Sequence, residues 1–358
     1  MKSTHFFLGA NSAEGFYSLY QQLLDAGLYD LLILKGGPGC GKSTFMRRAA
    51  ASLEERGLET VYIHCSGDPD SLDGVIFPAL KTAIVDGTAP HVLEPRCVGA
   101  PERYVDLSGG YDLGAVKAMA GELRARTEAY RASYGEAYHV LRALGGVDAQ
   151  RHALVRADFD VEKLLRRAAG IAARELRGRG EHTGRTADVF LGGPTCQGVV
   201  CRFDSVDALC PRVYELCDSY GLAVPALRLL HESAVEAGLD VLVGRDPLRP
   251  ELPSHLMIPA RGVAFVTTGE GVRYEGKPYR RLRIDALAEE PLTRAQRAHL
   301  RFLRRIRRAL EEEAVGALAR AKRGHDALEA AYRPCVDFSV AEALCRVETE
   351  RIAGYERG

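Results

Sequence analysis

The segment that decides the fold is Leu31-Leu32-Ile33-Leu34-Lys35-Gly36-Gly37-Pro38-Gly39-Cys40-Gly41-Lys42-Ser43-Thr44. Its first four residues form an uninterrupted apolar run, which is typical of a buried parallel strand. Gly36, Gly41, Lys42 and Ser43 fit the pattern G-x-x-x-x-G-K-[ST] without departure. Residues 45–56 favour a helix, and Gly57 ends it. The pattern therefore lies between a strand and a helix, which is the context of a phosphate-binding loop (P-loop).

Each residue type in this loop has a physical reason. Glycines let the backbone turn its N–H groups toward phosphate oxygens, and the helix N-terminus adds free N–H groups and its positive dipole end. Lys42 is expected to stabilise charge on the β- and γ-phosphates, and the Ser43 hydroxyl to ligate Mg²⁺. Cys40 is either a reactive thiol or a residue of which only the backbone matters. The predicted nucleotide-binding residues are Gly36, Gly37, Pro38, Gly39, Cys40, Gly41, Lys42, Ser43 and Thr44.

A carboxylate at the end of a neighbouring strand is expected to complete the magnesium site. The apolar run Thr82-Ala83-Ile84-Val85 ends at Asp86, after a complete βαβ unit. We therefore predict Asp86 as a magnesium ligand with Ser43, and Asp86 and Lys42 as the catalytic residues. The alternative is that Asp86 only belongs to a turn, since Asp-Gly is a common turn pair.

Polar side chains also follow the intervening strand, expected at residues 59–65. Ligands of open α/β sheets bind beyond the carboxyl ends of the strands, so these side chains are candidates to lie near the γ-phosphate or a second substrate. His64, Asp68 or Asp73 is a candidate base or water-positioning residue. The alternative is a hydrogen-bonded turn, because Asp-Pro-Asp-Ser is common turn chemistry. The candidates are His64, Asp68, Asp70, Asp73 and His91.

The chain repeats itself at an almost constant offset. Gly57-Leu58-Glu59 matches Gly238-Leu239-Asp240, 181 positions later, and Phe7-Leu8-Gly9 matches Phe190-Leu191-Gly192, 183 positions later. We predict two copies, at residues 1–179 and 180–358. Each copy is expected to hold an α/β unit followed by helices, from about 113 to 179 and from about 290 to 358.

The second copy lacks the residues of the loop chemistry. At an offset of 181, Lys42 matches Ala223, Ser43 matches Val224, and Asp86 matches Thr267. We therefore predict a degenerate copy that keeps the fold without binding nucleotide in this way. It is retained either to bury a shared face about a pseudo-two-fold axis or to supply an arginine such as Arg245 to the γ-phosphate. Six further residues of the second copy either form another site or are ordinary turn and core residues. They are Cys196, Cys201, Cys210, Cys217, Asp218 and Ser219.

Four segments carry a resemblance to a known family: residues 7–10, 34–44, 64–73 and 84–91. Together they resemble an uncharacterised bacterial family of P-loop ATPases, mostly from Firmicutes-type bacteria, that is built from two P-loop-like halves. The resemblance implies a P-loop NTPase fold, with a three-layer arrangement around a parallel sheet, and ATP binding in the first half. Relatives can carry a usable loop in both halves, and this sequence departs from them there.

Composition limits the remaining classes. Lys+Arg and Asp+Glu balance at 48 each, so no net charge favours nucleic acid or an acidic membrane. The Arg-rich stretch 300–308 is either a local basic patch or a solvated helix face. No apolar run approaches the length of a membrane span, and we expect a cytoplasmic location. The nine cysteines include no CxxC pair, so they fit reduced thiols and show no zinc-site spacing.

Three functions fit these observations. We favour an ATPase that requires ATP and Mg²⁺. The alternatives are a small-molecule or nucleotide kinase, and a regulatory module in which bound ATP changes the interface between the halves. No guanine-reading motif is present, so GTP is less favoured. The sequence does not identify a protein partner.

Overall fold

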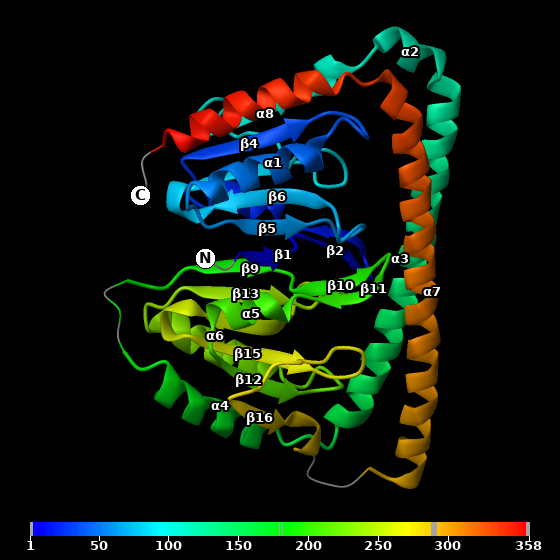
Figure 1. Ribbon diagram of the computed structural model, residues 1–358. Coiled ribbons are helices and arrows are strands. Elements are labelled where there is room, and N and C mark those ends of the chain that lie inside the picture. The colour runs from blue at the N-terminus through cyan, green and yellow to red at the C-terminus, as the bar shows by residue number, and fades with distance from the viewer. Residues whose placement is uncertain (1–2, 179, 181, 288–291, 356–358) are drawn as a thin grey trace.

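The computed structural model describes residues 3–178, 180, 182–287 and 292–355. Two α/β units, each with a six-stranded mixed sheet, lie beside a pair of long helices that runs along both (Figure 1). The predicted α/β class and the duplication are therefore confirmed. Residue 179, at the predicted junction, and residue 290, at the predicted start of the second helical extension, lie outside the described residues.

The first unit contains one sheet with the strand order β1-β5-β6-β7-β4-β8 and a separate hairpin of β2 and β3. The strands predicted around residues 31–34, 59–65 and 82–85 and the helix predicted at residues 45–56 are all present. The elements are β1 (Thr4–Phe6), β2 (Gly9–Ser12), β3 (Gly15–Ser18), η1 (Tyr20–Asp25), β4 (Asp30–Lys35), α1 (Lys42–Glu55), β5 (Val61–His64), β6 (Leu72–Phe77), η2 (Pro78–Leu80), β7 (Thr82–Asp86), β8 (Glu102–Asp106) and η3 (Ser108–Gly110).

The expectation of a parallel sheet is wrong in one respect. Strand β6 lies between β5 and β7 and runs antiparallel to both, so the sheet is mixed. The connection from β5 is too short for the crossover helix that parallel neighbours need, and the Cys65 N–H donates to Ser71 O (3.1 Å) to close it as a hairpin. Asp73 therefore lies on a strand rather than in the expected loop.

The second unit repeats this topology. Its sheet has the order β16-β12-β15-β14-β13-β9, and its antiparallel strand β14 corresponds to β6. Strand β12 corresponds to β4 and β15 to β7. The elements are β9 (Thr186–Val189), β10 (Gly192–Thr195), β11 (Gly198–Cys201), α5 (Phe203–Leu209), β12 (Arg212–Cys217), α6 (Val224–Glu236), β13 (Val241–Arg245), β14 (Pro253–Ile258), η4 (Pro259–Arg261), β15 (Val263–Thr268), β16 (Arg280–Arg283) and η5 (Ile284–Ala286).

The two units meet through matched residues. Phe7 and Phe190, which correspond in the sequence repeat, exchange backbone hydrogen bonds of 2.9 and 2.8 Å. Such self-pairing is expected at a two-fold axis. One apolar core continues across the junction and contains Ile33 and Val85 of the first sheet with Met257 and Val266 of the second. The two copies thus bury a shared face, as one of the two hypotheses for retaining the second copy requires.

The remaining helices are exchanged between the units. Helices α3 and α7 run antiparallel along one side of the molecule, whereas α8 packs on the first unit and α4 on the second (Figure 1). Each copy therefore covers the outer face of the other copy's sheet. None of the described helices combines the length and the apolar character that crossing a membrane requires. These elements are α2 (Leu113–Ala118), α3 (Ala120–Arg156), α4 (Val161–Glu175), α7 (Arg294–Tyr332), η6 (Arg333–Cys335) and α8 (Phe338–Ala353).

Candidate functional site

The predicted loop joins the end of β4 to the first residue of α1. Gly39 and Gly41 have φ angles of 71° and 95°, in the left-handed region where a side chain is strained. A Cβ atom on Gly36 would lie 2.6 Å from the Cys40 sulfur. Glycine is therefore required by backbone conformation at Gly39 and Gly41 of the loop and by a close approach at Gly36.

The structure brings Lys42 and Asp86 together. The Lys42 ammonium donates to the carbonyl oxygens of Gly36 (2.9 Å) and Gly37 (3.1 Å), and it lies 3.7 Å from Asp86 Oδ2. Asp86 ends β7, which pairs in parallel with β4 and sets Asp86 opposite Leu34. The other carboxylate oxygen, Oδ1, accepts from the N–H (2.8 Å) and hydroxyl (2.6 Å) of Thr88. The turn contact and the contact with the loop lysine thus use different oxygens.

Ser43 lies in the first turn of α1. Its hydroxyl oxygen accepts a hydrogen bond from the Leu72 N–H at 3.1 Å, which ties the start of the helix to β6. An oxygen that accepts from one side retains a lone pair for a cation. Ser43 is thereby held beside β6, and the neighbouring strand β7 ends at Asp86.

The far helices reach this loop as well. The Gly39 N–H donates to Glu329 Oε1 of α7 (3.2 Å), and the Tyr111 hydroxyl donates to Pro38 O (2.9 Å). Phe338, at the start of α8, lies 3.8 Å from where a Cβ atom on Gly41 would be. Sequence reasoning missed Glu329 and Tyr111, because neither belongs to a motif and Glu329 is 290 residues from its partner.

The Cys40 side chain is buried, at 2% exposure, and this burial raises the pKa of its thiol. A reactive cysteine needs an accessible thiolate. Of the two interpretations of Cys40, the structure supports the one in which the backbone matters.

Three of the polar candidates are held by contacts away from Lys42. His64 lies 3.0 Å from His5 and 2.7 Å from Pro69 O, and its pKa is lowered to about 4, chiefly by burial. Asp68 lies 3.3 Å from Lys322 of α7, and Asp70 accepts from Gln197 of the second unit at 2.7 Å. Asp68 and Asp70 therefore link the first unit to the second copy, whereas His64 is held within the first unit.

Asp73 on β6 and His91 after β7 lie together. His91 Nε2 is 3.2 Å from Asp73 Oδ2, and both residues are buried. Burial raises the pKa of Asp73, the nearby charge of Asp86 raises it further, and the charges of His91 and Lys42 oppose the shift. Asp73 is thus the candidate base on which both Asp86 and Lys42 act.

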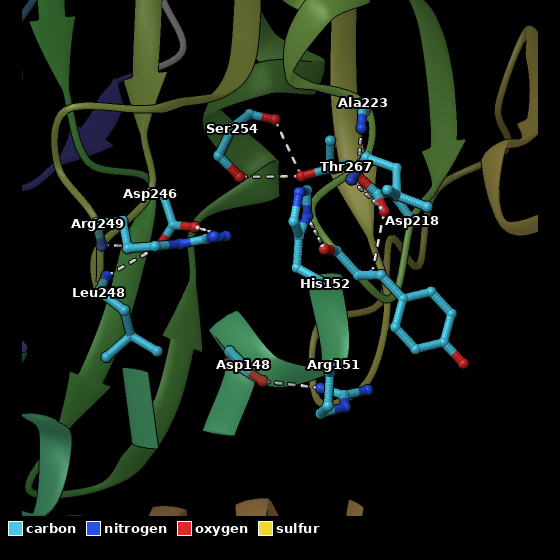
Figure 2. Close-up of polar contacts among 12 residues, drawn as sticks. Asp148, Arg151, His152, Asp218, Ala223, Asp246, Leu248, Arg249, Ser254 and Thr267 are labelled. Carbon is cyan, nitrogen blue, oxygen red and sulfur yellow. Dashed lines mark hydrogen bonds and ion pairs between the residues drawn. The ribbon is translucent and has the colours of Figure 1, made fainter. Parts of the chain in front are cut away.

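In the second unit the corresponding loop is filled by its own side chain. The Asp218 carboxylate accepts from the N–H groups of Tyr220 (3.1 Å), Leu222 (2.9 Å) and Ala223 (2.7 Å), as Figure 2 shows in part. The positions matched to Asp73 and Asp86 are Ser254 and Thr267, whose hydroxyls lie 2.9 Å apart (Figure 2). Two carboxylates are therefore replaced by two neutral hydroxyls.

The structure shifts the match between the two loops by one residue. Strands β4 and β12 begin at Asp30 and Arg212, and helices α1 and α6 begin at Lys42 and Val224; both pairs are 182 positions apart. Val224, rather than Ala223, thus stands at the position of Lys42. The conclusion that the lysine is missing from the second copy is unchanged.

The other second-half candidates are occupied by structural contacts. Arg245 pairs with Asp188 on the second sheet, at 2.7 and 3.0 Å. Cys201 and Cys210 belong to the shared core, and burial raises the pKa of their thiols to about 12 and about 11. The Ser219 N–H donates to Asp285 at 2.9 Å. These contacts support ordinary turn and core roles.

Three of the five arginines in the stretch 300–308 have acidic partners. Arg304 lies 2.5 Å from Glu270, Arg307 lies 3.1 Å from Asp148, and Arg308 lies 2.9 Å from Glu312. A helix face on which most positive charges are paired attracts nucleic acid phosphates weakly. The solvated helix face is the interpretation that these pairs support.

Comparisons of the chain with family models, with curated proteins and with solved structures found no significant match. The function is therefore argued from the geometry of the site, and above all from the difference between its two copies.

Proposed function

We propose that the first unit is a P-loop NTPase that binds ATP with Mg²⁺ and hydrolyses it. The observation that carries this proposal is the contrast between two corresponding loops of one chain. The loop at residues 36–44 turns on glycines beside Lys42 and Asp86, whereas the loop at residues 218–223 surrounds its own carboxylate. A carboxylate that accepts several backbone N–H groups occupies the kind of site that a phosphate takes at a helix N-terminus.

In this proposal Lys42 leaves the carbonyl oxygens of Gly36 and Gly37 for the β- and γ-phosphates. Ser43 and Asp86 would hold the magnesium ion. The loop N–H groups and Lys42 stabilise the charge that develops during phosphoryl transfer. The bound Mg²⁺ supplies Lewis-acid polarisation of the phosphate oxygens.

A second candidate is a regulatory module in which nucleotide occupancy matters more than turnover. The hydrogen bond from the Gly39 N–H to Glu329 favours the regulatory module. A bound phosphate and this carboxylate would compete for the same N–H group of the loop. Glu329 lies near the C-terminal end of α7, and this helix runs along both units (Figure 1). Displacement of Glu329 could therefore shift α7 and change the conformation of the second copy. A kinase remains a prediction, and so do the family resemblance and the cytoplasmic location.

The test is ATP and GTP binding and hydrolysis with Mg²⁺, on wild type and on Lys42→Ala. Val224→Ala, at the corresponding position of the second unit, is the matched control. We expect wild type and Val224→Ala to bind ATP and hydrolyse it, and Lys42→Ala to lose both. Binding without hydrolysis in wild type would favour the regulatory module or a kinase. If neither wild type nor Val224→Ala binds any nucleotide, the proposal is wrong.

A further inference from the structure

A second cluster of ligating side chains lies beside the loop. Cys65 follows β5, Asp73 lies on β6, and His91 lies after β7, so three separate segments contribute. One sulfur, one carboxylate oxygen and one ring nitrogen from these residues lie within 4.8 Å of one another. Asp73 and His91 are 5% and 6% exposed.

The cluster contains polar atoms that are left without hydrogen bonds. Among the described residues, Asp73 Oδ2, His91 Nδ1 and the Tyr20 hydroxyl are buried and have no hydrogen-bond partner. His91 Nε2 is close to Asp73 Oδ2 in distance, at 3.2 Å, but this ion-pair contact does not have hydrogen-bond geometry. Buried polar atoms in native proteins are almost always satisfied, so three such atoms in one place point to a missing partner.

The donor set identifies the chemistry of that partner. A thiolate, an imidazole and a carboxylate are the three kinds of side chain that bind Zn²⁺, whereas Mg²⁺ takes oxygen ligands. The backbone N–H groups of Asp68 and Gly67 face the Cys65 sulfur, and the Tyr20 hydroxyl lies beside Asp73. Outer partners of this kind orient metal ligands and tune their basicity.

We propose that Cys65, Asp73 and His91 form a zinc site with three protein ligands and a fourth position open to water. A zinc ion with its ligands at about 2.0–2.3 Å draws the three donor atoms together from their present spacing. The site is separate from the proposed magnesium site at Ser43 and Asp86. The sequence shows no zinc spacing because the ligands come from three segments that only the sheet brings together. This inference does not rest on nucleotide binding.

The test uses purified full-length protein, stripped of metal and then dialysed against Zn²⁺ or Co²⁺. We expect about one zinc per chain by elemental analysis, as a single three-ligand site requires. With Co²⁺ we expect the near-ultraviolet charge-transfer absorption of a cobalt–thiolate bond. Cys65→Ala is expected to lose that absorption, and His91→Ala and Asp73→Asn to lose stoichiometric binding. Tyr20→Phe is expected to weaken affinity about tenfold, as the loss of an outer partner does.

Matched controls separate this site from others in the chain. Cys97→Ala removes an exposed cysteine, and His325→Ala alters a partly exposed group of ligating side chains on α7, formed with Asp326 and Glu329. Both variants are expected to keep the cobalt absorption. Lys42→Ala is expected to keep zinc while losing nucleotide, so the two proposals fail independently. Folded wild type that shows no cobalt–thiolate absorption overturns the inference without any variant. A Cys65→Ala protein that retains the absorption overturns it as well.

Discussion

The loop after β4 and the loop after β12 have the same place in the fold and opposite contents. The first turns through two left-handed glycines and has Lys42 and Asp86 beside it, whereas the second closes on the Asp218 carboxylate. Both solve one problem, which is the set of free N–H groups at a helix N-terminus. The second solves it with a carboxylate of its own loop, whereas in the first the Gly39 N–H donates to Glu329 of a distant helix. The second copy thus has three hydrogen bonds from its loop N–H groups to one carboxylate of the same loop.

The largest effect is expected where the first loop meets its carboxylate. Asp86→Ala removes the proposed magnesium ligand and should lower ATP turnover by about 100-fold or more, the order seen when one electrostatic contact to the transition state is lost. Thr267→Ala, at the corresponding position of the second unit, should leave turnover unchanged. Steady-state hydrolysis over a range of Mg²⁺ concentrations measures both. Equal losses in the two variants would contradict the asymmetry of the copies.

A second change breaks the closed loop. Asp218→Ala leaves the N–H groups of Tyr220, Leu222 and Ala223 without their acceptor, and should lower the free energy of unfolding by about 2 kcal/mol. Asp218→Asn keeps one acceptor oxygen and should lose less. Urea denaturation measures the difference. If Asp218→Ala is as stable as wild type, the carboxylate does not hold this loop together.

Acid should act on the second unit through a histidine that the first unit lacks. His255 is buried and its Nδ1 accepts from the Thr267 N–H (3.2 Å), while Gly74 stands at its position in the first unit. Burial lowers the pKa of His255 from 6.5 to about 3. The unfolded chain therefore binds the proton first, and the stability contribution is complete above pH 6.5 and declines as the pH falls toward 3.

Lowering the pH from 6.5 to 5 should cost roughly 1.5 kcal/mol through this residue. Urea denaturation of wild type and His255→Gln over that range measures the contribution. His255→Gln should show a flatter dependence on pH. Identical slopes for the two proteins would show that His255 is not the group responsible.

The smallest effect concerns the contact between the copies at the open loop. Glu329→Gln removes a negative charge that competes with phosphate and should tighten ATP binding by about fivefold, consistent with the 1 kcal/mol or so of one charged hydrogen bond. Glu312→Gln is the control, because Glu312 pairs with Arg308 on the same helix. Calorimetric titration measures both affinities. Weaker binding in Glu329→Gln would mean that Glu329 supports the loop instead of competing with the ligand.

The local part of this site follows from the sequence. Gly36, Gly41, Lys42 and Ser43 have a fixed spacing, and adjacent parallel strands end at the same edge of a sheet, so Asp86 was expected beside Lys42. These are consequences of periodicity and chain direction alone. The duplication is visible in the sequence because residues of the two copies match at an almost constant offset.

The remainder depends on contacts between distant segments. No residue near Gly39 in the sequence predicts its contact with Glu329, and no residue near Asp73 predicts that it lies on an antiparallel strand. The one-residue error in matching Lys42 to Ala223 arose because the offset is 182 from β4 to β12 but 181 from β7 to β15. Long-range packing of this kind has no local pattern from which to predict it.

Because the helices are exchanged, the first unit cannot complete its packing until the second copy has been synthesised. Helix α1 carries the loop, yet its outer face is completed by α8, and the Cys345 thiol contacts the Phe45 carbonyl oxygen 300 residues away. A ribosome adding roughly 5–20 residues per second needs tens of seconds to bridge that gap. The first unit therefore waits, with part of its core uncovered, until the second copy has been made. The loop at residues 36–44 is therefore among the earliest segments to be translated and among the last to be fully packed.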